Sequence, residues 1–138
     1  MGERWVEDLR RDGWSAEAID KEVRKSHRRI TEAPVVIVAC LCAEGLDAYP
    51  DSQRQMAEYL MAAHSLGAAV QNIMVAAYAR GLGTCWMCAP LFCPEVVVQA
   101  LGVSNELKPQ GLITVGYPMG WPEARQRRPM VELVIEVS

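Results

Sequence analysis

The distribution of hydrophobic and polar positions along the chain predicts a mixed domain of helices and strands. The run PVVIVACLC, beginning at Pro34, consists of β-branched and small apolar residues and predicts a strand buried on both faces. Segments 84–88 and 111–117 also have strand composition. Because segments with helical periodicity lie between these runs, we expect one domain, residues 1–138, with one sheet and a few helices.

Three shorter helices are expected around the strands. The first covers 3–11 and ends at Asp12-Gly13, the second is capped by Ser15, and the third begins at Pro94 and stops at Gly102. The first two should lie on the outside, because their apolar stripes are narrow: Trp5, Val6 and Leu9 on the first, and Ile19, Val23 and Ile30 on the second.

A longer helix starts near Asp51 or Ser52 and reaches Arg80, with Gly67 leaving open whether it is one helix or two in succession. From Leu66 to Ala79 its only strongly polar residues are two amides, so it is apolar all round and should be buried on every side. A lone domain of 138 residues has little core to cover it. We therefore predict a homodimer with this helix near its centre.

Composition and charge narrow the class of protein. A net charge of -3 gives no reason to expect nucleic-acid binding, and 51% hydrophobic with 22% charged residues is typical of a soluble globular domain. The most apolar part of the long helix is shorter than the roughly twenty residues that a bilayer needs, so we expect no membrane span. The first thirty residues are too charged for a secretory signal, and five cysteines fit reduced, buried thiols in the cytoplasm.

Two motifs have a candidate chemistry beside a structural interpretation. Cys85 and Cys88 form a Cys-x-x-Cys pair, but the first cysteine of a redox dithiol normally lies at the start of a helix, and the spacing of a zinc site is lacking. We therefore interpret these cysteines as small apolar core residues and expect no metal site. Arg125 and Arg127 could jointly hold a phosphate, although spacing alone favours a solubilising loop. The tail MVELVIEVS alternates enough for an edge strand or an arm on a partner subunit.

The run HSLGAAVQNIMVAAYARGLGTCWMCAPLFCPEVV, followed by QGLITVGYP and RQRRP, resembles the flavin-dependent nitroreductase family. Within that family, segment 91–97, together with Trp5, Leu9 and Asp12-Gly13, is similar to the nitroreductase-like C-terminal domain of the enzymes that complete coenzyme F420. The resemblance covers most of the chain, from Trp5 to Arg128.

The resemblance implies a three-layer α+β sandwich with a small mixed or antiparallel sheet, a central buried helix, and flavin mononucleotide (FMN) in a groove between two subunits. It implies a backbone amide near the flavin N5 and arginines on its phosphate. The cofactor-binding residues would be Gly83, Trp86, Met87, Cys88, Ala89, Arg125 and Arg127. The flavin itself would carry the chemistry, so no catalytic side chain is assigned.

The expected function is FMN-dependent two-electron hydride transfer through flavin N5, from a nicotinamide or F420-type donor to a small molecule. A link to coenzyme F420 maturation is also expected from the resemblance. The family's usual N-terminal Arg-Arg-Ser segment would lie upstream of this chain, leaving the domain incomplete there. The alternative is a truncated, cofactor-free homologue that acts as a ligand-binding module or a dimeric scaffold.

Overall fold

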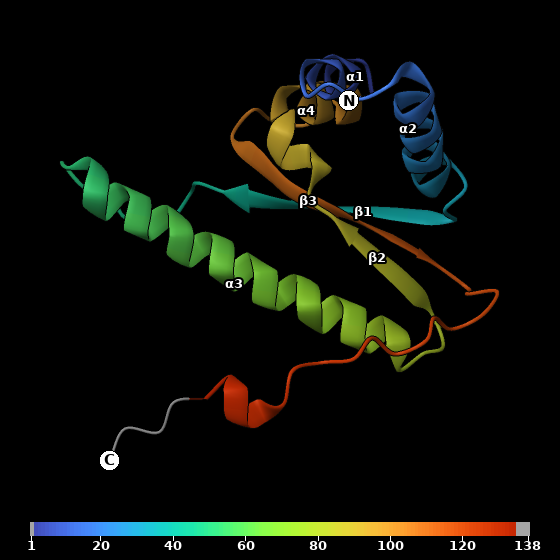
Figure 1. Cartoon of the computed structure of the whole chain (residues 1–138). Helices are drawn as coiled ribbons and strands as arrows, with labels where there is room; N and C mark the ends of the chain where they lie inside the picture. Colours follow the sequence, from blue (N-terminus) through green and yellow to red (C-terminus); the bar gives the residue numbers. More distant parts are fainter. Residues whose placement is uncertain (1, 135–138) are drawn as a thin grey trace.

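The computed structural model describes residues 2–134 and has three layers (Figure 1). Helices α1 (Gly2–Arg11), α2 (Ala16–Thr31) and α4 (Pro94–Leu101) lie on one side of the sheet, and the long helix α3 (Ser52–Tyr78) lies on the other. This arrangement confirms the predicted α+β sandwich. A short 3₁₀ helix, η1 (Ala89–Phe92), connects the sheet to α4.

The sheet contains β1 (Val35–Cys42), β2 (Gly83–Met87) and β3 (Leu107–Gly116) in the order β1-β3-β2. Both pairings are antiparallel, so of the mixed and antiparallel sheets that were predicted, the described residues form the antiparallel one. The strand predicted from 111 begins earlier, at Leu107, because a β-bulge between Ala39 and Cys40 lets the pairing with β1 continue past Gly111.

The core lies on both faces of β3. Ile113 is 0% exposed and pairs with Ile37 on one side and Trp86 on the other, so these three side chains share a face of the sheet. That face packs on α3. The opposite face, which carries the buried Leu112, packs against η1 and α4, where Val97 and Val98 are buried.

Local side-chain bonds set the beginnings of two helices. Ser15 Oγ accepts a hydrogen bond from the Ala18 N–H at 3.2 Å, which confirms the predicted cap of α2. Asp51 Oδ1 accepts from the Arg54 N–H at 2.9 Å, so Asp51 caps α3. The helix then runs unbroken through Gly67.

The cap of α3 predicts a pH-dependent stability. The backbone N–H and then the guanidinium of Arg54 donate to Asp51 and lower the pKa of its carboxyl. A lowered folded-state pKa adds stability above the unfolded value of about 3.9, and this stability is lost as the pH falls through the folded value. Asp51→Asn keeps a capping side chain but loses the charge. We expect its Tm to be lower than that of the wild type near neutral pH and equal to it at a pH below the folded-state pKa of Asp51.

Thermal unfolding from neutral pH to pH 2 would measure this difference, with Ser52→Ala as the control. Ser52 is the first residue of α3 and does not supply its cap, so its removal should leave the pH profile unchanged. A constant difference in Tm between wild type and Asp51→Asn at every pH would contradict the prediction.

Most of α3 is exposed in the single chain. Val70 is the one residue of α3 that is buried, whereas Met61 and Val75 are 59% and 55% exposed. The prediction of burial on every side is therefore wrong for the chain by itself, because the sheet covers only one side of the helix. Among the described residues α3 alone is long and apolar enough to cross a membrane, which is weak evidence because core helices of soluble proteins are similar.

Two further expectations are corrected. Met130–Glu132 forms the 3₁₀ helix η2, in which the Glu132 N–H donates a hydrogen bond to the Pro129 carbonyl. The prediction of a terminal edge strand is therefore wrong for 130–134, and 135–138 lie outside the described residues. The cysteines are all free thiols, but Cys42, Cys85 and Cys88 are exposed in the chain and only Cys93 is buried. No group of three metal-ligating side chains occurs among residues 2–134.

Candidate functional site

A groove of about 880 Å³ lies where the C-terminal end of α3, the start of β2 and the end of β3 meet. Its walls are mostly apolar and aromatic, with Met74, Tyr78, Val115 and Trp121 among the lining residues. Arg127 is the single charged side chain that lines it within the described part of the chain. A concave apolar site with one convergent charge is the usual form of a small-molecule site.

The Gly-Leu-Gly break shapes the groove by turning the chain sharply from α3 into β2. Gly81 has a φ of +76°, a conformation that favours glycine, and the Leu82 N–H donates to the Ala77 carbonyl at 3.0 Å to end the helix. At Gly83 a Cβ would lie 3.3 Å from the Pro118 Cβ. The glycine therefore permits the close approach of the segment that follows β3.

An aromatic contact joins that segment to the end of α3. The rings of Tyr78 and Trp121 lie edge to face, with centroids 4.8 Å apart and an interplanar angle of 72°. Both rings line the groove, and Arg127 follows Trp121 on the same irregular segment. The contact thus holds the segment against the helix at the point where the arginine enters the groove.

The structure brings together only some of the predicted cofactor residues. Gly83 and Arg127 line the same groove. Met87 is at the other end of β2, about 13 Å from Gly83 at the usual rise of a strand, and the exposed Cys88 and Ala89 follow it. Arg125 is exposed on the segment and is not one of the groove residues, so one arginine of the predicted pair enters the groove instead of two.

Trp86 has a packing role that the sequence did not reveal. A Cβ on Gly111 would lie 2.4 Å from the Trp86 Nε1, and one on Gly67 would lie 3.7 Å from its Cη2. The indole therefore fits between two glycines, one on β3 and one on α3. Its side chain joins the sheet to the helix, while a cofactor role for its backbone stays a prediction.

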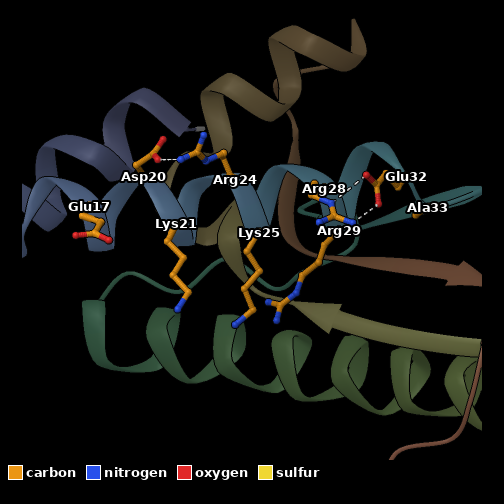
Figure 2. Close-up of a pocket in the computed structure, with 9 residues that line it drawn as sticks. All are labelled: Glu17, Asp20, Lys21, Arg24, Lys25, Arg28, Arg29, Glu32 and Ala33. Atoms are coloured by element: carbon orange, nitrogen blue, oxygen red, sulfur yellow. Dashed lines mark hydrogen bonds and ion pairs between the residues drawn. The ribbon is translucent and has the colours of Figure 1, made fainter.

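A second groove, of about 840 Å³, lies along α2 and is lined by charged side chains (Figure 2). Lys21, Lys25 and Arg29 are one turn apart and extend to the same side, whereas Arg24 and Arg28 pair with Asp20 and Glu32. The lining comes from α2 and the two residues that follow it, so this groove is an open helix surface. Residues 25–29, a basic run near the end of α2, are exposed except for Ser26.

Comparison with known proteins places this fold in a family. The three-layer architecture with a small antiparallel sheet defines the chain as an α+β protein. Residues 3–117 match the Nitroreductase family, and the chain belongs to that family. Members of this family typically bind flavin, are commonly dimeric and are generally soluble.

Individual relatives agree with this assignment. YfhC of Bacillus subtilis (strain 168), provisionally named an NAD(P)H nitroreductase, is 28% identical over 68 residues, which are 49% of this chain and 35% of YfhC. A Bacteroides fragilis NCTC 9343 structure, provisionally described as an oxidoreductase, is 25% identical with a TM-score of 0.65, covering 80% of this chain and 47% of that one. The chain thus spans less than half the length of these two relatives.

A third relative contains a cofactor. A structure from Desulfovibrio desulfuricans, provisionally described as a nitroreductase and in complex with FMN, is 28% identical to this chain. Its TM-score is 0.59, and the match covers 77% of this chain and 56% of that one.

Proposed function

We propose that this chain is part of an FMN-dependent oxidoreductase and that the groove at the end of the sheet holds the phosphate end of FMN. The observation that carries the proposal is Arg127, the single charged residue lining an otherwise uncharged groove in the described chain. A guanidinium in such a setting forms strong charge-assisted bonds with a phosphate. The match to the Nitroreductase family and its FMN-containing relative supports the same cofactor.

Several of the predicted residues would serve this cofactor. Arg127 would hold the phosphate, and Gly83 permits the close approach of Pro118, which brings the segment carrying Arg127 beside the start of β2. From Gly83, β2 leads to the turn at Trp86–Ala89, which would lie along the flavin ring. Because β2 is at the edge of the described sheet, one side of its backbone is free to face a ligand.

When bound, FMN supplies two-electron hydride transfer between a donor and a small-molecule acceptor. The protein would bind and orient the cofactor and exclude water from it. Pro90, which is buried, fixes the turn after β2 and so determines where the backbone of Cys88 and Ala89 lies. No side chain of this chain is assigned a proton-transfer role.

Titration with FMN tests this function. We expect the purified protein to bind FMN with saturable quenching of flavin fluorescence and to show a bound-flavin absorption spectrum. Reduction of the bound flavin by NADPH, NADH or reduced coenzyme F420 would then identify the donor. Absence of both spectral change and quenching would reject the oxidoreductase proposal.

We further propose that the chain is a cytoplasmic homodimer whose subunits meet through α3. The support is the apolar surface that the single chain leaves exposed on this helix, including Leu60, Met61, Ile73 and Val75. An exposed apolar surface of this extent is uncommon on a monomer. A second copy packed there would bury the helix as its sequence requires.

The dimer proposal predicts a local effect of truncating α3. We expect Met61→Ala to raise the dimer dissociation constant by at least about ten-fold, because burying a Met side chain contributes roughly 1.5–3 kcal/mol and each subunit would lose one. Met119→Ala is the matched control, since Met119 is fully exposed on the irregular segment after β3. Sedimentation equilibrium would measure both, and equal dissociation constants for the two variants would contradict the assignment of α3.

A link to coenzyme F420 maturation is the finer proposal. It rests on segment 91–97, which forms the end of η1 and the start of α4, and on Trp5 and Leu9 of α1. Reduction of the bound flavin by reduced coenzyme F420 and not by NADPH or NADH would support it. Reduction by nicotinamides alone would reject it.

The alternative is a cofactor-free homologue that acts as a ligand-binding module or a dimeric scaffold. The observation that favours it is that only one arginine of the predicted pair lines the groove. A stable dimer that leaves FMN fluorescence unquenched is the result expected for this alternative.

A further inference from the structure

We propose that the Tyr78–Trp121 contact is a positioning device that holds Arg127 in the groove and so sets its affinity for the phosphate of FMN. The inference rests on the proposed function for the identity of the ligand. It goes beyond that function by assigning a role to two aromatic residues outside the predicted cofactor-binding set. Trp121 acts here through Arg127, as a positioning residue.

The segment that carries Arg127 has few other attachments. Between Gly116, the last residue of β3, and Pro129, no backbone hydrogen bond is formed by the segment in the described structure. Pro118 touches the α3–β2 turn, because a Cβ on Gly83 would lie 3.3 Å from it. Beyond that point the edge-to-face contact of Trp121 with Tyr78 attaches the segment to the end of α3 before the arginine.

The attachment is well placed to fix the arginine. Tyr78 is the last residue of the long helix α3, which ends at the groove. The ring of Trp121 therefore packs on a residue that belongs to regular secondary structure. Arg127 lies six positions after Trp121 along the chain, and both line the same groove. Without the aromatic contact this stretch would sample many conformations, and ordering it would oppose phosphate binding.

The ligand comparison that isolates this role is FMN against riboflavin, which lacks the phosphate. We expect Trp121→Ala to raise the FMN dissociation constant about five-fold, the effect of losing one aromatic contact. Riboflavin affinity should change less than two-fold, roughly within the error of such a titration. Trp121→Phe keeps an aromatic ring on Tyr78 and should retain most of the affinity for FMN.

A double-mutant cycle adds the second criterion. In an Arg127→Gln background, Trp121→Ala should cause no further loss of FMN affinity, because the residue that it positions is gone. Equal losses for FMN and riboflavin, or a full loss in the Arg127→Gln background, would overturn the proposal and show instead that Trp121 contacts the flavin itself.

Limited proteolysis measures the positioning without any flavin. Trypsin can cut after Arg125 and Arg127, and we expect it to do so about five-fold faster in Trp121→Ala than in the wild type, because the segment is released. Trp121→Phe should be cut at nearly the wild-type rate. Equal cleavage rates for the wild type and Trp121→Ala would overturn the proposal. If Trp121→Ala is cleaved faster but the wild type binds no flavin, only the identity of the ligand would be rejected.

Discussion

Arg127→Gln is expected to raise the dissociation constant for FMN by about ten- to hundred-fold, since a hydrogen bond to a charged group contributes roughly 1.5–3 kcal/mol. Arg127 is the single charged side chain that lines the groove in residues 2–134, so no described neighbour can take its place. Glutamine keeps much of the length and loses the charge. Fluorescence titration at two salt concentrations would measure the loss and show a weaker salt dependence in the variant.

Arg125→Gln is the matched control for this prediction. Arg125 lies on the same exposed segment, two residues earlier, but is not among the residues of the groove. Its substitution should change FMN affinity only slightly. Equal losses for the two variants would show that both arginines bind the phosphate, as the sequence suggested, and that the segment adopts a different arrangement when the ligand is bound.

Gly111→Ala is expected to destabilise the folded chain by about 1–3 kcal/mol, the usual cost of overpacking a well-packed site. The added Cβ would lie 2.4 Å from Trp86 Nε1, 3.1 Å from its Cδ1 and 3.2 Å from the Met87 carbonyl oxygen. Movement of the partly exposed indole would not remove the whole clash, because the Met87 carbonyl oxygen belongs to the backbone of β2. Denaturant unfolding would measure the loss as a lower midpoint at constant m-value.

Two comparisons make this prediction specific to the contact with Trp86. Gly120→Ala is the control, because a Cβ there meets nothing within 4 Å. In a Trp86→Leu background, Gly111→Ala should cost less than in the wild type, since the clashing ring is absent. If Gly111→Ala were as harmless as Gly120→Ala, the indole would not fill the space between β3 and α3.

Patterns of the sequence predicted the regular elements well, because these depend on local chemistry. The β-branched run after Pro34, the cap at Ser15 and the stop at Gly102 each act within a few residues, and each is found where expected. The predicted burial of that strand on both faces is wrong for the single chain, because β1 is an edge strand whose first two residues are exposed. The strand predicted for 130–134 is wrong for the opposite reason. Alternation permits a strand, but a strand also needs a neighbour, and the described chain offers this segment none.

The candidate site was predictable only in part, because a groove depends on which distant residues meet. The family resemblance indicated Gly83 and Arg127, which line the groove. It did not indicate Tyr78 or Trp121. An aromatic residue just before the glycine turn and another within the proline-rich loop after β3 form a pattern that could have suggested their contact. It also gave no reason to place the Trp86 side chain between two glycines, since that contact joins residues remote in sequence.

The strand order has a consequence for the way the chain folds during synthesis. β3 lies between β1 and β2, which have no hydrogen bonds to each other, and it is the last of the described strands to be made. Val35 must therefore remain unpaired until Val115 has left the ribosome, and no strand pair of this sheet can form before the first residues of β3 have done so. Such long-range pairing slows folding, so the apolar β1 would be exposed to aggregation or chaperone binding until β3 has been made.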